Sequence, residues 1–151
     1  NESLFVASDR AIRILRGGTI TAQLVLPQDD TISDIALSSD GQSIAIGGDA
    51  VWLSRLDNTG LPGEPVQVTD VSHNAPYQVR FLPETQLLLV VNADTLSFYE
   101  VLEAGKPALL SQVSLPPSLG RPVDLVLSPQ QTLIAIGGQN GLIHILGIPN
   151  Q

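Results

Sequence analysis

The sequence predicts an all-β protein made of repeated, four-stranded antiparallel sheets. An apolar strand, a polar turn and a second apolar strand occur together three times, around Asp40, Glu84 and Gln130, at spacings of 44 and then 46 residues. A fourth, incomplete copy aligns residues 4–8 with residues 44–48. No segment shows the 3.6-residue apolar period of an amphipathic helix. Short strands repeated every 40 to 50 residues or so are typical of β-propeller blades.

Each copy divides into strands at its turn residues. First strands that end in Ser-Asp-Gly or Pro turns are expected at 32–37, 77–82 and 123–127. Second strands, almost wholly apolar and therefore expected to be buried on both faces, are predicted at 4–7, 43–47, 87–91 and 133–137. Amphipathic third strands follow at 12–15, 51–55, 96–101 and 142–146, the last after the tight turn Asn140-Gly141. Fourth, outer strands are expected at 20–26, 66–68 and 109–115.

These strands form one propeller segment of about three and a half blades. The blades are expected at approximately 1–31, 32–75, 76–121 and 122–151, the first without its inner strand and the last without its outer strand. Propellers need at least four blades, because each blade buries its faces on its neighbours. Since the chain also lacks methionine, we expect a partial propeller that belongs to a larger protein or is completed by another chain.

The last predicted strand should then have an unpaired edge. Residues 142–148 are expected to present unpaired backbone groups and an apolar flank, and 133–151 contain no Asp, Glu, Lys or Arg to guard them. We therefore expect the 151-residue chain to associate through this edge or to need the rest of a parent protein.

Composition excludes several classes of function. Fifteen acidic and seven basic residues give a net charge of −8, which disfavours nucleic acid and anionic membrane surfaces as partners. No apolar run is long enough to span a membrane. The absence of cysteine excludes disulfides, thiolate metal sites and cysteine nucleophiles, and it favours an exported protein over a cytoplasmic one. We expect no cofactor and no metal site.

The repeat also resembles a known family. The pattern Pro-x-x-apolar-x-apolar-x-Pro occurs at 76–83 and 122–129, and a looser form occurs at 32–39. With the phrase Leu-Asp-Asn-Thr-Gly at 56–60, it resembles the WD40-like propellers, and most closely their YVTN and lactonase-type branch. The Trp-Asp dipeptide is absent, and Leu146-Gly147 stands in its place. This scaffold carries binding proteins and enzymes alike.

The starts of the first strands are candidate functional positions, because in a propeller they line the central channel. The equivalent residues are Asp34, Gln78 and Asp124. They form either an acidic ring suited to a cation or a basic peptide, or a polar lining that hydrates the channel. The resemblance to lactonase-type enzymes implies Arg and His at these positions, and this chain has neither there.

Loops between outer and inner strands, at 27–31, 70–76 and 116–121, form the expected top face. Their candidate contact residues are Asp29, Asp30, His73, Asn74 and Arg121. No catalytic residue is assigned. The sequence thus predicts a non-enzymatic propeller segment for protein–protein recognition or scaffolding, with a protein or peptide partner, a basic one included. The alternative is part of a lactonase or hydrolase-type enzyme whose catalytic blades lie outside this chain.

Overall fold

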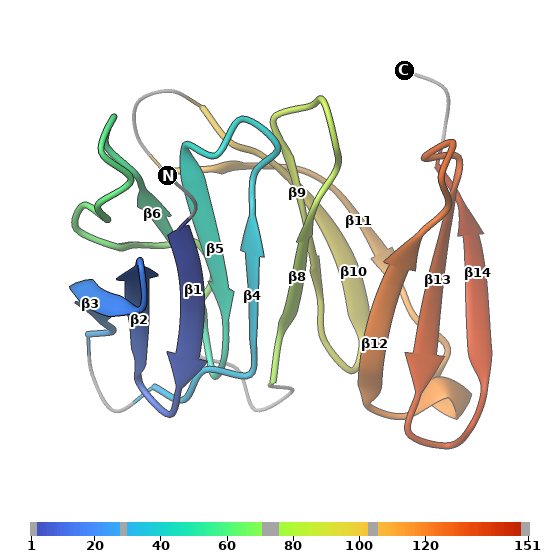
Figure 1. The fold of residues 1–151 in the computed structure, drawn as a ribbon. Helices are drawn as coiled ribbons and strands as arrows, with labels where there is room; N and C mark the ends of the chain where they lie inside the picture. Colours follow the sequence, from blue (N-terminus) through green and yellow to red (C-terminus); the bar gives the residue numbers. More distant parts are fainter. Residues whose placement is uncertain (1–2, 28–29, 71–75, 103–105, 149–151) are drawn as a thin grey trace.

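Four antiparallel sheets stand side by side in a computed structural model of the chain (Figure 1). The structure describes residues 3–27, 30–70, 76–102 and 106–148. In the first sheet the order is β1 (Ser3–Ser8), β2 (Ala11–Arg16), β3 (Thr19–Val25). In the second it is β4 (Asp34–Leu37), β5 (Ser43–Gly47), β6 (Val51–Arg55), β7 (Val66–Gln67).

The third and fourth sheets continue the same meander. The third contains β8 (Gln78–Phe81), β9 (Leu87–Val91), β10 (Thr95–Glu100) and β11 (Ala108–Ser114). A single turn of 3₁₀ helix, η1 (Pro117–Leu119), leads to the fourth, which contains β12 (Pro122–Leu127), β13 (Leu133–Gly138) and β14 (Ile143–Gly147). The prediction of an all-β, partial propeller is confirmed. Every strand pairs only with its sequence neighbours, as turn-connected strands do.

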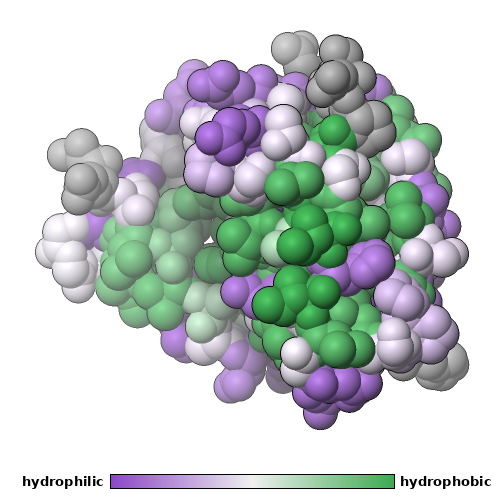
Figure 2. All heavy atoms as spheres, turned by 90° about the vertical axis from the view of Figure 1, so that its right-hand side faces the viewer, coloured by the Kyte–Doolittle hydropathy of each residue, from purple (hydrophilic) through white to green (hydrophobic). Residues whose placement is uncertain are grey.

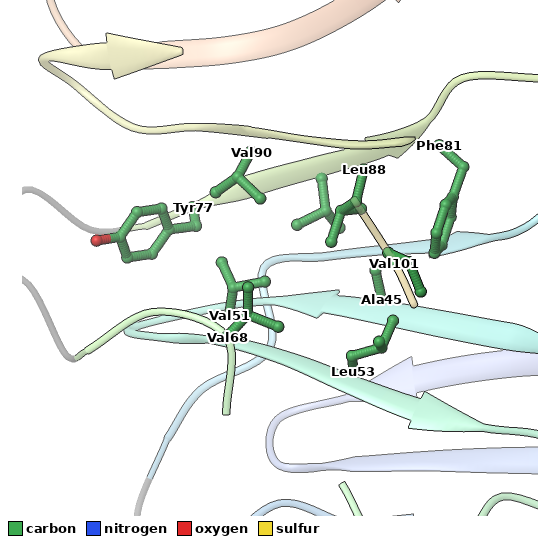
Figure 3. Close-up of a cluster of buried hydrophobic side chains, with 10 residues drawn as sticks. Ala45, Val51, Leu53, Val68, Tyr77, Phe81, Leu88, Val90 and Val101 are labelled. Atoms are coloured by element: carbon green, nitrogen blue, oxygen red, sulfur yellow. The ribbon is translucent and has the colours of Figure 1, made fainter. Parts of the chain in front are cut away.

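Apolar side chains from facing sheets form the core. Between the second and third sheets, Ala45, Val51 and Leu53 meet Leu88 and Val90 (Figure 3). A similar cluster lies between the third and fourth sheets, and another lies between the first and second. Each sheet therefore depends on its neighbours for burial, as in other repeat architectures.

Three of the four second strands, β5, β9 and β13, contain deeply buried residues, as the repeat predicts. Six equivalent side chains are all buried: Ile44, Ile46, Leu88, Val90, Ile134 and Ile136. Burial on both faces, however, holds only for β5 and β9. In β1, Leu4 and Val6 are exposed; in β13, Leu133 is exposed and Ala135 and Gly137 are only half-buried, so the prediction is wrong for these two strands. The physical reason is that, within the described residues, the first and fourth sheets each have a neighbouring sheet on one side only.

Candidate functional site

The inner edge of the arc brings the three predicted channel residues into one row. Strand β8 contacts both β4 and β12. Asp34, Gln78 and Asp124 occupy the same register, opposite Gly47, Val91 and Gly137 on their partner strands. The row lies where the first strands of neighbouring sheets approach each other.

Arg80, which the sequence analysis did not single out, joins two of these residues. Its guanidinium lies 2.5 Å from Oδ2 of Asp34 and 3.5 Å from Oδ1 of Asp124. One cation on the third sheet therefore bridges carboxylates of the second and fourth. Arg80 follows Gln78 by two residues and so lies on the same face of β8, a spacing that could have revealed it.

Asp34 also ties two sheets together through the backbone. Its Oδ1 accepts the amide N–H of Ile35 at 3.0 Å, and its Oδ2 accepts the amide N–H of Val79 on the next sheet at 3.0 Å. Both oxygens of this carboxylate are therefore hydrogen-bonded. The positive charge of Arg80 also lowers the net negative charge of the predicted acidic ring. In the same row, Oε1 of Gln78 is buried without a hydrogen-bond donor among the described residues.

Asp124 repeats half of the Asp34 arrangement. Its Oδ1 accepts the amide N–H of Leu125 at 2.8 Å, as Asp34 accepts that of Ile35. No described residue donates to its Oδ2. On Asp34 that oxygen binds the next sheet through Val79, so on Asp124 it is oriented for a sheet that the described residues do not supply.

The predicted top-face residues differ in their exposure to solvent. Asp30 is only 5% exposed, and its carboxylate accepts the amide N–H groups of Asp49 and Ala50 and the indole N–H of Trp52, at 2.7, 3.2 and 2.6 Å. These bonds fix the turn between β5 and β6. Arg121 is exposed. The other three candidates, Asp29, His73 and Asn74, lie outside the described residues.

A small polar pocket lies between the second and third sheets. It measures about 230 Å³, and its lining includes Asp70, Tyr77, Asn92 and Tyr99. Burial, followed by the nearby Tyr77 and Asp70, raises the pKa of Tyr99 above its ordinary value. Tyr99 therefore stays neutral there and can donate a hydrogen bond.

The described ranges contain neither a cluster of metal ligands nor a membrane-spanning helix. Nowhere in them do three His, Asp or Glu side chains gather as ligands of a metal ion would. Nor do those ranges contain a helix long and apolar enough to cross a membrane.

The fourth sheet exposes an apolar face, which we call the open face. Ile143 and Ile145 are 71% and 63% exposed. The register places Val126 and Leu133 on the same side, and Val123 reaches Gly137 there. Figure 2 shows this side of the molecule, with hydrophobic atoms gathered across its centre.

The same positions are buried in the preceding sheet–sheet interface. Ile143 pairs with Gly137 as Val51 pairs with Gly47, and Ile145 lies two residues further along, as Leu53 does. Val51 and Leu53 are 0% and 4% exposed, because the third sheet covers them. The open face is therefore a sheet–sheet contact face without its neighbour among the described residues.

Gly47 and Gly137 show the same difference in their surroundings. A Cβ atom on Gly47 would lie 2.3 Å from the carbonyl oxygen of Tyr77, which leads into the third sheet. A Cβ atom on Gly137 would meet nothing nearer than Cγ2 of Val123 at 3.7 Å. Gly137 thus leaves an open notch at the position where Gly47 meets the backbone of the next sheet.

Comparison with known proteins identifies the fold. No protein-family profile and no curated protein matches the sequence, but 334 chains of solved structures match. One belongs to the "Crystal Structure of Mitotic Checkpoint Complex"; at 12% identity it gives a TM-score of 0.72 over 96% of this chain and 43% of that one. The likeness shows the fold of a β-propeller segment. The chain spans less than half the length of the matched chain.

Proposed function

We propose that this chain is a non-enzymatic β-propeller segment for protein–protein recognition or scaffolding. Its open face is covered, in the working assembly, by the remainder of a larger propeller or by another chain. Its repeats belong to the YVTN and lactonase-type branch, as the Pro-bounded first strands and the phrase at 56–60 suggest. The observation that carries the proposal is the exposure of Ile143 and Ile145 at positions where the preceding interface buries Val51 and Leu53.

Hydrophobic burial gives this face a strong tendency to associate. Folded monomers rarely expose contiguous apolar patches of more than a few hundred Å². Each large aliphatic side chain gains about 1.5–3 kcal/mol when it is fully removed from water. A partner that covers Ile143, Ile145 and Val126 together therefore has ample driving force.

Polar details of the face favour a blade-like partner over an unspecific hydrophobic one. The notch at Gly137 accepts close backbone approach, as Gly47 accepts Tyr77. Oδ2 of Asp124 would accept a backbone N–H, as Oδ2 of Asp34 accepts that of Val79. These features suit the inner strands of another β-sheet.

We also propose a second contact, between the loops of the top face and a basic protein or peptide, because the chain is acidic. A net charge of −8 favours a basic protein or peptide partner through long-range attraction. The inner edge contributes less to this than its two carboxylates suggest, because Arg80 binds both.

Sedimentation velocity over a range of concentrations tests the proposal. We expect the wild-type chain to associate, and the double variant Ile143→Gln with Ile145→Gln to shift strongly toward monomer. Leu109→Gln is the matched control, because Leu109 is 53% exposed but lies on β11, away from the open face. A monodisperse wild-type species of 16.0 kDa at high concentration would contradict the proposal.

A further inference from the structure

The polar pocket between the second and third sheets lies where the repeat has a small residue in place of a large one. Ser97 pairs with Val90, which faces the second sheet. In the preceding repeat, Trp52 pairs with Ile46, which faces the first sheet. Cross-strand partners share a face of their sheet, so Trp52 and Ser97 hold equivalent positions in successive interfaces. Trp52 is buried in the first interface, whereas Ser97 lines the pocket in the second.

The lining of the pocket distinguishes it from a packing defect. Voids that imperfect packing leaves in a core are apolar and stay empty. Val68 and Val90 line the pocket and belong to the aliphatic cluster of Figure 3, and Tyr77 ends that cluster with its hydroxyl pointing away from it. The other described lining residues all carry hydrogen-bonding side chains. The pocket therefore suits a polar occupant.

Asn92 is held at the pocket by the turn between β9 and β10. It is 8% exposed, and its Oδ1 accepts the amide N–H groups of Asp94 and Thr95 at 3.0 and 2.8 Å. These bonds fix the side-chain amide, and its Nδ2 donates to no described residue. A buried donor without an acceptor is costly, so this NH2 group favours an occupant that accepts a hydrogen bond.

Two hydroxyl groups line the pocket beside this amide. Ser97 and Tyr99 alternate on β10 and therefore lie on the same face of the sheet. Ser97 is only 5% exposed, and neither hydroxyl has a hydrogen-bond partner among the described residues. Because the phenol of Tyr99 stays neutral, it can donate as well as accept. The third sheet thus presents three uncharged polar groups, which together donate and accept hydrogen bonds.

Two exposed charges of opposite sign also line the pocket. Asp70 follows β7 and Lys106 precedes β11, and no described ion pair joins them. A cationic ligand would meet the Lys106 ammonium group and the Asn92 NH2 group, and an anionic ligand would meet the Asp70 carboxylate. Since the two charges balance, the pocket favours neither kind of ion.

We propose that the polar pocket binds a small, neutral, hydroxyl-rich molecule about the size of one sugar ring. A hydroxyl group donates and accepts, as water does, so it replaces water in the pocket without a loss of hydrogen bonds. The pocket volume of about 230 Å³ is smaller than that of sites for drug-sized ligands, which begin at about 300 Å³. This inference goes beyond the proposed function, because the pocket lies between two described sheets and does not involve the open face.

NMR titration of the isotope-labelled chain tests the proposal, with D-glucose, D-galactose, D-mannose and myo-inositol as separate probes. We expect at least one of them, at millimolar concentration, to give saturable shifts in the amide signals of Asn92, Ser97 and Tyr99. L-Alanine, a zwitterion, and inorganic phosphate should bind there more weakly. No saturable shifts with any of the four neutral probes would overturn the proposal. Saturable binding of L-alanine or phosphate alone would overturn it as well.

Variants of Ser97 locate the bound probe. Ser97→Trp places at this position the residue that fills the preceding interface, and it should weaken binding at least tenfold. Ser97→Ala removes only the hydroxyl and should weaken binding at least threefold, without the risk of overpacking. Ser111→Ala is the matched control and should change the affinity less than twofold, because Ser111 is exposed on the neighbouring β11 and does not line the pocket. An affinity that neither Ser97 variant changes would overturn the assignment of the site.

Discussion

Substituting alanine at Gly47 and at Gly137 compares one position of the repeat with and without a neighbouring sheet. Both residues pair with the start of the third strand of their sheet. Neither has a positive φ, so backbone strain does not separate them. The two positions differ in the room available for a Cβ atom. At Gly47 the new Cβ would lie 2.3 Å from the Tyr77 carbonyl oxygen, whereas at Gly137 its nearest neighbour would be 3.7 Å away.

The structure gives the magnitude. Ordinary contact requires about 3.4 Å or more, so the backbone at Tyr77 must retreat by roughly 1 Å, and such overpacking costs about 1–3 kcal/mol. The retreat also strains two hydrogen bonds of 2.9 Å, from the Ser33 hydroxyl to the Tyr77 carbonyl and from the Tyr77 amide to the Gly48 carbonyl. Each contributes about 1 kcal/mol. Alanine also lowers the conformational entropy of the unfolded chain, which stabilises the folded state by about 0.4–1 kcal/mol. The net decrease in the free energy of unfolding for Gly47→Ala is therefore about 2–4 kcal/mol.

Urea denaturation followed by far-ultraviolet circular dichroism measures the difference. We expect Gly47→Ala to lose about 2–4 kcal/mol, and Gly137→Ala to be neutral or to gain up to about 1 kcal/mol. The thermal midpoint should fall by several degrees for the first variant only. Equal destabilisation by both substitutions would refute the reasoning, because it would mean that Gly137 is as closely covered as Gly47.

Three further substitutions test the core, the inner edge and one turn. Leu88→Ala should lower the free energy of unfolding by about 2–5 kcal/mol, because Leu88 is fully buried between two sheets; an unchanged urea midpoint would contradict its place in the core. Arg80→Met should lower the free energy of unfolding by about 1–2 kcal/mol, because it removes the cation that binds Asp34 and Asp124; an unchanged urea midpoint would contradict a stabilising bridge. The Ser38 hydroxyl, then the amide of Gln42, lowers the pKa of Asp40, so this carboxylate stabilises the fold above its unfolded pKa of 3.8 and loses that effect as pH falls through the lowered value. Ser38→Ala should therefore raise the pKa of Asp40 in an NMR titration and move acid unfolding to higher pH. An unchanged pKa of Asp40 would contradict the hydrogen bond from the Ser38 hydroxyl to this carboxylate.

Strand positions could be predicted because each strand is fixed by local sequence. Apolar alternation, the polar turns and the repeat spacing place β5, β6 and β9 at their observed bounds. The internal repeat makes the strand bounds more precise, since three aligned copies must agree on where a strand begins. Burial of Ile44, Leu88 and Ile134 follows from the same equivalence.

The side-chain contacts of the inner edge could not be predicted in the same way. Arg80 binds carboxylates 46 residues before it and 44 residues after it, on two other sheets. No local pattern encodes such a contact, although the spacing from Gln78 places Arg80 on the right face. The burial of Asp30 could not be predicted for the same reason: a loop position suggests an exposed side chain, but its carboxylate accepts the indole N–H of Trp52, which lies 22 positions away in the sequence.

Exposure of the open face illustrates why a repeat predicts contact faces better than surfaces. Val51 and Ile143 occupy the same register and are both aliphatic, so the sequence assigns them the same role. Only the presence of the next sheet decides whether that role is fulfilled within the described chain. A face prepared with aliphatic side chains, a glycine notch and an unengaged Asp124 oxygen has the features of an interface. We therefore take these equivalences, more than the hydrophobicity of the face alone, as the argument that a β-sheet covers it.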